Sequence, residues 1–137
     1  MRGATMAFDA LRAFSLTENS LPPSARRAGL ESERRYLAGE RITEADWRAF
    51  PTLLRFDPVY HGHFKCNWQR VQDYPNLVNY LRELYQWPGI KETFDLQQTK
   101  VGYYNQRNVN PTGIVPLGPD MSHLDAAHDR GRLPAVN

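Results

Sequence analysis

The densest group of reactive side chains lies in the segment Asp-Pro-Val-Tyr-His-Gly-His-Phe-Lys-Cys, which begins at Asp57. Its carboxylate, its two imidazoles (His61 and His63) and its thiol (Cys66) are all side-chain types that bind metal ions. Residues two apart on a helix point about 200° apart, so the two histidines share an ion only where the backbone is extended. The remaining histidines lie far along the chain. We therefore predict no metal site, with zinc binding at this segment as a minor alternative.

Cys66 is the single cysteine of the chain, which excludes an internal disulfide and a Cys-x-x-Cys redox pair. A catalytic thiolate needs a cationic neighbour or a helix N-terminus. Lys65 precedes Cys66 in the sequence, but neighbours in sequence need not place their side chains in contact. We interpret Cys66 as a structural thiol, with a Cys66 nucleophile and a histidine base as the alternative. The lone cysteine also favours a reducing, cytoplasmic location.

Tyr60, Tyr103 and Tyr104 could act on a ligand, because a phenol donates a hydrogen bond to a developing oxyanion and its ring stacks on an aromatic group. Packing in the core or in an interface is the more common role of such tyrosines. Asp57, three residues before Tyr60, could orient the phenol or cap a bent turn. The sequence leaves both alternatives open.

Three tryptophans each lie near a basic residue, a pattern that can bind single-stranded nucleic acid. The pairs are Trp47 with Arg48, Trp68 with Arg70, and Trp87 with Lys91. The 17 Lys and Arg residues are nearly balanced by 15 Asp and Glu residues, for a net charge of +2. We therefore predict no nucleic acid partner, and interpret these tryptophans as core residues beside solvated basic side chains.

The element that must position these residues starts with a capping box. Thr43 can cap a helix, and Asp46 at the third helical position can accept a hydrogen bond from the Thr43 backbone N–H. Ile42 before the cap can pack on Trp47 as a hydrophobic staple. The helix that begins here should run to about residue 63. Two internal prolines, at positions 51 and 58, should bend or interrupt it because each removes a backbone hydrogen bond.

The rest of the chain predicts an all-α fold with short connections, as in a helical bundle. We expect residues 34–39 to end an earlier helix at Gly39, a second helix from about 75 to Pro88, and a third over 90–104. Residues 110–119 hold three prolines and two glycines, which predict an ordered extended segment that lies over an apolar surface through Ile114, Val115 and Leu117.

The 137 residues fit one domain. We divide them into a poorly ordered, divergent leader (1–30), a helical domain with an extended Pro/Gly-rich end (31–119), and a polar tail (120–137) that frays. No apolar run is long enough to span a membrane, and the N-terminus has no signal-peptide core, so we predict no membrane association.

Several motifs, in order over about residues 34–119, resemble a known family. They are Arg-Tyr-Leu-Ala-Gly from Arg35, Ile-Thr-Glu-Ala-Asp from Ile42, Leu-Arg-Phe-Asp-Pro-Val-Tyr from Leu54, Gly-His-Phe-Lys-Cys-Asn from Gly62, Asp-Tyr-Pro-Asn-Leu from Asp73, and Asn-Pro-Thr-Gly-Ile-Val-Pro from Asn110. The first two resemble the helical C-terminal domain of glutathione S-transferases. The others resemble the glutathionyl-hydroquinone reductases, the xi class of these enzymes.

The resemblance implies a glutathione S-transferase C-terminal-like helical bundle that follows a thioredoxin-like N-terminal domain. It implies glutathione as co-substrate and an aromatic quinone or hydroquinone as ligand. In this family a cysteine in a Cys-Pro-Trp context attacks the glutathionyl sulfur, and tyrosines of the helical domain contact the quinone oxygens. By motif position, two of these substrate-binding tyrosines fall on Tyr60 and Tyr103.

The chain contains no Cys-Pro-Trp, and Cys66 matches a family position that is not the nucleophile. We therefore expect a C-terminal part of such an enzyme, with no catalytic residue of its own and inactive alone. Its apolar surface would contact the thioredoxin-like domain in cis or form a homodimer. The alternative is a stand-alone, non-catalytic binding module with the same fold.

Overall fold

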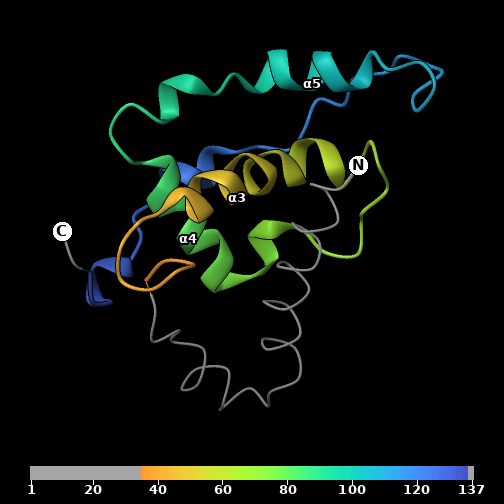
Figure 1. The fold of residues 1–137 in the computed structure, drawn as a ribbon. Helices are drawn as coiled ribbons and strands as arrows, with labels where there is room; N and C mark the ends of the chain where they lie inside the picture. Colours follow the sequence, from red (N-terminus) through yellow and green to blue (C-terminus); the bar gives the residue numbers. More distant parts are fainter. Residues whose placement is uncertain (1–34, 136–137) are drawn as a thin grey trace. The chain divides into compact units, whose positions relative to one another are not determined.

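A computed structural model describes residues 35–135, which form two units. One unit contains the residues up to Thr52 together with those from Arg130 onward, and the other contains Leu53–Asp129. The helices of the described residues are, in chain order, α3 (Glu44–Arg55), η1 (Phe56–Tyr60), η2 (Val71–Asp73), α4 (Pro75–Tyr85), η3 (Lys91–Thr93), α5 (Leu96–Tyr104), η4 (Ser122–Asp125) and η5 (Arg130–Arg132). Their order can be followed in Figure 1. The predicted leader lies outside the described residues.

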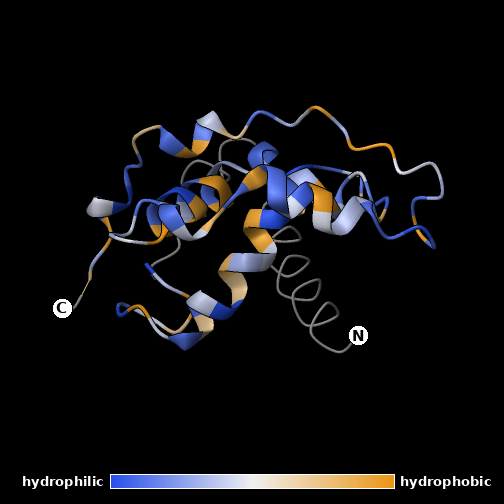
Figure 2. Cartoon of the chain, turned by 90° about the horizontal axis from the view of Figure 1, so that it is seen from above, coloured by the Kyte–Doolittle hydropathy of each residue, from blue (hydrophilic) through white to orange (hydrophobic). Residues whose placement is uncertain are grey.

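The all-α prediction is confirmed, since the described part of the chain contains helices and no β-strand beyond an isolated bridge. Hydrophobic and hydrophilic residues stand side by side on these helices (Figure 2). Within residues 35–135, none of the helices has both the length and the apolar character that crossing a bilayer requires.

The chain makes a tight turn at Tyr36–Gly39 and not the last turn of a helix, so this part of the prediction is wrong. Tyr36 and Gly39 exchange two backbone hydrogen bonds, of 2.8 and 3.1 Å. Gly39 has φ +132°, which a residue with a Cβ adopts only with strain. The glycine at the end of this motif therefore serves a turn and not a helix cap.

α3 passes through Pro51 and then changes its hydrogen-bond pattern. From Phe56 the helix widens into the π-helical η1, in which the His61 N–H donates to the Phe56 carbonyl (2.8 Å). Pro58 lies in this wide turn, where its lack of an N–H no longer interrupts the α-helical ladder. The predicted bend therefore takes the form of a π-helical turn, and the helix ends at Tyr60 and not near residue 63.

α4 begins as predicted with Pro75 in its first turn, where a missing N–H costs nothing. Its apolar stripe of Leu77, Leu81 and Leu84 is buried. The chain leaves the helix through a turn at Gly89, whose φ of +80° favours glycine. α4 contacts both η2 and η4, and α5 contacts η1. The core of the unit Leu53–Asp129 is therefore built around α4 and η1.

The third predicted helix is divided. Its first residues form the short η3, and α5 begins only at Leu96, where the Asp95 side chain accepts a hydrogen bond from the Gln98 N–H (2.8 Å). An N-cap aspartate explains the break, because a residue in this role has extended backbone angles. Periodicity alone missed this cap.

The Pro/Gly-rich segment after α5 is free of helix and strand, as predicted, but its apolar residues do not cover the fold. Leu117 is 99% exposed and Ile114 is 68% exposed. The segment is instead held by Lys100 of α5, which is buried and donates to the carbonyls of Leu117 (2.8 Å) and Gly118 (3.3 Å). The segment is therefore fixed by hydrogen bonds from the buried Lys100 ammonium group to two backbone carbonyls, and not by the hydrophobic contacts that the sequence predicted.

The polar tail does not fray between residues 122 and 129. Leu124 in η4 is completely buried, and η4 contacts α4. Arg82 of α4 and Gln86, the residue that caps the end of α4, bind the tail. Arg82 donates to the His123 carbonyl (2.8 Å), and Gln86 donates to the carbonyls of Leu124 (2.7 Å) and Ala126 (2.8 Å). Composition suggested a free end, whereas one buried leucine and a few backbone hydrogen bonds hold the segment.

Candidate functional site

The two tyrosines predicted to bind substrate lie close together. Tyr60 ends η1 and Tyr103 lies in the last turn of α5, and their ring centroids are 6.2 Å apart with the planes tilted by 52°. The ring of Phe64 completes the group, 5.4 Å from Tyr60 and 6.1 Å from Tyr103. We call these three residues the tyrosine cluster. The contact between η1 and α5 is what brings its two halves together.

A second aromatic layer supports the tyrosine cluster. His63 is buried, and its ring meets those of Phe64 and Tyr104 edge-on, with centroids 4.7 and 4.8 Å apart. Burial is the main cause that lowers the pKa of His63, and its Nε2 atom has no hydrogen-bond partner. The imidazole is therefore held neutral and packs as an aromatic ring.

Gly62 makes this packing possible for a steric reason. A Cβ atom at position 62 would lie 2.7 Å from the Tyr104 hydroxyl oxygen, which is closer than van der Waals contact allows. The Tyr104 hydroxyl also donates to the Pro58 carbonyl at 3.5 Å. The close approach of α5 to η1, and so the position of Tyr103 beside Tyr60, depends on the missing side chain.

Tyr60 is a protonated hydrogen-bond donor at physiological pH. Burial raises the pKa of Tyr60 most, and its hydrogen bond with Tyr103 raises it further. Burial also raises the pKa of Tyr104. Because a raised pKa keeps the proton on the oxygen, Tyr60 can donate to a partly negative ligand oxygen but is not a base.

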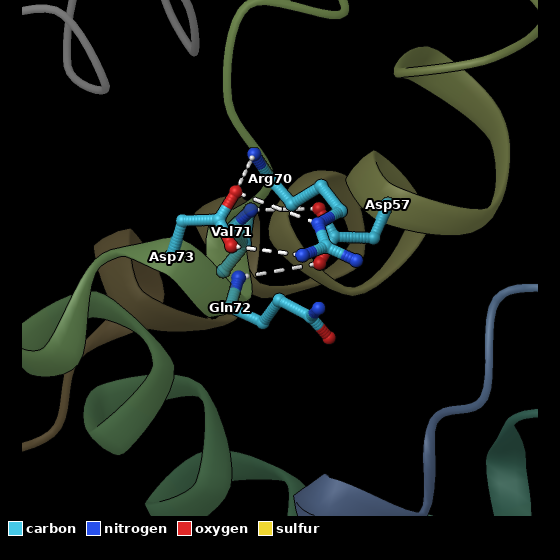
Figure 3. Close-up of polar contacts among 5 residues, drawn as sticks. All are labelled: Asp57, Arg70, Val71, Gln72 and Asp73. Carbon is cyan, nitrogen blue, oxygen red and sulfur yellow. Dashed lines mark hydrogen bonds and ion pairs between the residues drawn. The ribbon is translucent and has the colours of Figure 1, made fainter.

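Asp57 does not serve the tyrosines. Its buried carboxylate accepts hydrogen bonds from the backbone N–H groups of Val71 (2.7 Å) and Gln72 (3.3 Å), as Figure 3 shows. Burial is the largest influence on its carboxyl group and raises the pKa, although these two hydrogen bonds lower it. The sequence left open whether Asp57 orients the Tyr60 phenol or caps a turn. In the structure its carboxylate caps the start of η2 and so connects η1 to η2.

Cys66 has no sign of activation. Its thiol is half-buried and donates weakly to the Phe64 carbonyl (3.9 Å), and burial raises its pKa. The ammonium group of Lys65 binds the carbonyls of Gly62 (3.1 Å) and His63 (3.2 Å). A raised thiol pKa disfavours the thiolate, which fits the structural interpretation of Cys66.

Residues 35–135 contain no group of three or more His, Cys, Asp and Glu side chains that could hold a metal ion. The basic residues near the three tryptophans are paired with acids: Arg48 with Glu44 (2.7 Å), Arg70 with Asp73 (3.1 Å), and Lys91 with Asp125 (2.5 Å). Two of the tryptophans are not core residues, since Trp68 is fully exposed and Trp87 is 39% exposed, whereas Trp47 is half-buried. That part of the interpretation is wrong.

At the start of α3, the Asp46 carboxylate accepts from the Thr43 N–H (2.8 Å) and from the Thr43 hydroxyl (3.0 Å). It also accepts from the Leu37 N–H (3.0 Å), which holds the Tyr36–Gly39 turn against the helix start. Trp47 packs edge-on against Phe50, with centroids 6.0 Å apart. The Ile42–Trp47 staple remains a prediction.

The sequence interpretation did not identify Gly62, His63 and Phe64 as parts of the site. The sequence predicts a helix that runs to about residue 63, so Phe64 stands directly after its expected end. In the structure the helix has already ended, and Lys65 with φ +63° turns the chain in the left-handed region.

Comparisons with known proteins agree with this architecture. The sequence model of the family "Glutathione S-transferase, C-terminal domain" matches residues 6–83, a range that includes most of what we set apart as a leader. The glutathionyl-hydroquinone reductase PcpF of Sphingobium chlorophenolicum is 53% identical over 87 residues, which are 63% of this chain and 28% of PcpF. The glutathionyl-hydroquinone reductase YqjG of Escherichia coli is 46% identical over 107 residues, which are 77% of this chain and 32% of YqjG.

Solved structures are similar as well. The glutathione-bound structure of YqjG superposes with a TM-score of 0.71 at 42% identity, covering 88% of this chain and 38% of that chain. A xi-class glutathione transferase from Natrialba magadii gives a TM-score of 0.74 at 45% identity, covering 82% of this chain and 35% of that one. This chain thus spans about a third of the length of the curated relatives. It belongs to the glutathione S-transferase C-terminal domain family and is related to the glutathionyl-hydroquinone reductases of the xi class.

Proposed function

We propose that this chain forms the aromatic-substrate-binding part of a glutathione-dependent reductase that acts on glutathionyl-hydroquinones. The observation that carries the proposal is the pairing of Tyr60 and Tyr103, two phenols from separate elements whose ring centroids lie 6.2 Å apart. PcpF and YqjG, which share this part of the sequence, are named as reductases of such compounds.

In the proposed reaction, a cysteine thiolate attacks the glutathionyl sulfur of the substrate. The bond between sulfur and the aromatic carbon breaks, a disulfide between cysteine and glutathione forms, and the ring carbon takes up a proton as the hydroquinone leaves. A second glutathione then reduces that disulfide and yields glutathione disulfide. As the sulfur departs, negative charge develops on the hydroquinone oxygen. Phenol donors at Tyr60 and Tyr103 would stabilise that charge.

The attacking cysteine is proposed to come from a thioredoxin-like domain, and not from this chain. The single thiol here, Cys66, has a pKa that burial raises, so it is a poor nucleophile at neutral pH. With its own residues the chain would therefore bind and orient the aromatic half of the substrate, and glutathione would be held elsewhere. A non-catalytic binding module of the same fold is the second candidate, and the properties of Cys66 favour it for the chain alone.

Calorimetric titration of the 137-residue chain with a glutathionyl-hydroquinone tests the binding role. We expect Tyr60→Phe and Tyr103→Phe each to weaken binding by about 2- to 10-fold, the value of one neutral hydrogen bond. Tyr85→Phe is the matched control, because Tyr85 lies in α4 beside Lys91 and outside the tyrosine cluster. Unchanged affinity in both cluster variants would contradict the proposal.

Turnover by the isolated chain tests where the nucleophile lies. With glutathione as the only reductant, the isolated chain should bind the conjugate but release no hydroquinone, and Cys66→Ala should behave identically. Release of hydroquinone that is unaffected by Cys66→Ala but lost in Tyr60→Phe would mean that another group of this chain performs the attack. The assignment of the nucleophile to a second domain would then be wrong.

A further inference from the structure

Phe64 is an aromatic side chain that the fold leaves partly open to solvent. Its relative exposure is 39%, although rings surround it on several sides. The plane of Tyr60 is tilted by 50° to it, that of Tyr103 by 89° and that of His63 by 72°. All three contacts are therefore tilted or edge-on. None of these three rings stacks parallel on Phe64, and the exposed part of the side chain is where a planar ligand would reach it.

The backbone fixes this position of Phe64. Lys65 adopts φ +63°, and the Cys66 N–H donates back to the Tyr60 carbonyl (3.1 Å), which closes a loop over residues 60–66. The Lys65 ammonium group bridges the carbonyls of Gly62 and His63 within that loop. A ring presented on a hydrogen-bonded loop loses little conformational entropy when a ligand stacks on it.

We propose that Phe64 is a specificity-determining residue, the stacking wall on which the planar ring of the ligand lies while Tyr60 and Tyr103 contact its oxygens. This inference rests on the proposed function and extends it from oxygen recognition to ring recognition. The ligand class it selects is a planar aromatic diol, and extended ring systems are favoured over a single ring because they cover more of Phe64.

The test compares two ligands that carry the same two hydroxyl groups, hydroquinone and 1,4-dihydroxynaphthalene, titrated anaerobically into the 137-residue chain. The readout is the ratio of the two dissociation constants, which reports on ring size and not on the hydroxyl contacts. We expect the wild-type chain to prefer the naphthalene diol. Phe64→Leu should reduce that preference by about 3- to 10-fold, the value of one aromatic pair, and Phe64→Trp should restore it.

Trp68→Leu is the matched control, since it removes a fully exposed aromatic ring four residues away and should leave the ratio unchanged. Tyr103→Phe should weaken both ligands by the same factor and so leave the ratio unchanged while it supports the proposed function. A Phe64→Leu ratio equal to that of the wild type overturns the inference about Phe64 alone. If neither diol binds to the wild-type chain, both the inference and the proposed function are wrong.

Discussion

Single buried carboxylates organise the turns of this chain. Asp57 reaches across to the N–H groups that open η2, and Asp46 does the same for the residues before α3. The first residues of a helix have N–H groups with no partner inside the helix, so an acceptor there replaces water that burial removes. Because η1 carries both Asp57 and Tyr60, the cap also fixes the segment that presents the tyrosine cluster.

Replacing Asp57 should therefore destabilise the fold. Asp57→Ala leaves two backbone N–H groups without an acceptor, and we expect it to lower the free energy of unfolding by about 2 kcal/mol. Urea unfolding followed by circular dichroism measures this. Asp73→Ala is the comparison, because its carboxylate also accepts a backbone N–H, from Arg70, but on an exposed turn (Figure 3). A loss as large for Asp73→Ala as for Asp57→Ala would contradict the role of burial.

The same two residues should respond to pH with opposite signs. Burial raises the pKa of Asp57 above 3.8, so the unfolded chain loses this proton first as the pH rises. Stability from Asp57 is therefore fully present below pH 3.8 and declines until the folded pKa is passed. Hydrogen bonding to the Arg70 N–H is the largest influence that lowers the pKa of Asp73, so its contribution is present above 3.8 and is lost as the pH falls.

The contributions of Asp57 and Asp73 can be separated by measuring the free energy of unfolding of the wild type, Asp57→Asn and Asp73→Asn over a series of pH values. Relative to Asp57→Asn, the wild type should lose stability as the pH rises through this window. Relative to Asp73→Asn, it should gain stability. Two slopes of the same sign would show that the environment of one carboxylate differs from that described here.

At the scale of elements, the sequence predicted helices better than their junctions. The start of α4 at Pro75 and its leucine stripe follow from local rules that the fold obeys. The widening at Phe56, the break before Leu96 and the turn at Lys65 each depend on a partner elsewhere in the chain or on a backbone choice that periodicity does not encode. The site lies at two of these junctions, so its tyrosines could be identified by motif, whereas Phe64 and Gly62 could not.

The junction between η1 and α5 can be tested through Gly62. Gly62→Ala places a Cβ 2.7 Å from the Tyr104 oxygen, and Tyr104 is too deeply buried to move aside freely. We expect a loss of about 1–3 kcal/mol in the free energy of unfolding, as for other overpacked sites. Adding Tyr104→Phe removes the clashing atom, so the double variant should recover part of that loss. Purely additive effects would mean that the two residues do not meet.

At the scale of the whole molecule, polar contacts hold segments that composition describes as loose. Lys100 binds the Pro/Gly-rich segment, and Arg82 and Gln86 bind the tail, in each case through backbone carbonyls. Carbonyl acceptors exist at every residue, so the sequence of the tail does not reveal which of them will be used. Within the unit Leu53–Asp129, residues far apart in sequence are therefore joined by side chains of the helices.

The tail also contributes one residue, Leu124, to the core, and a substitution at this position measures the contribution. Leu124 is completely buried, and Leu124→Ala should lower the free energy of unfolding by about 2–4 kcal/mol through the lost burial and the cavity left behind. Leu117→Ala is the same chemical change at a side chain that is 99% exposed, where about 0.5 kcal/mol or less is expected. Thermal and urea unfolding of both variants measure the difference. If the two variants were equally stable, the tail would not be part of the cooperative fold, and the interpretation of residues 120–137 as a free end would be restored.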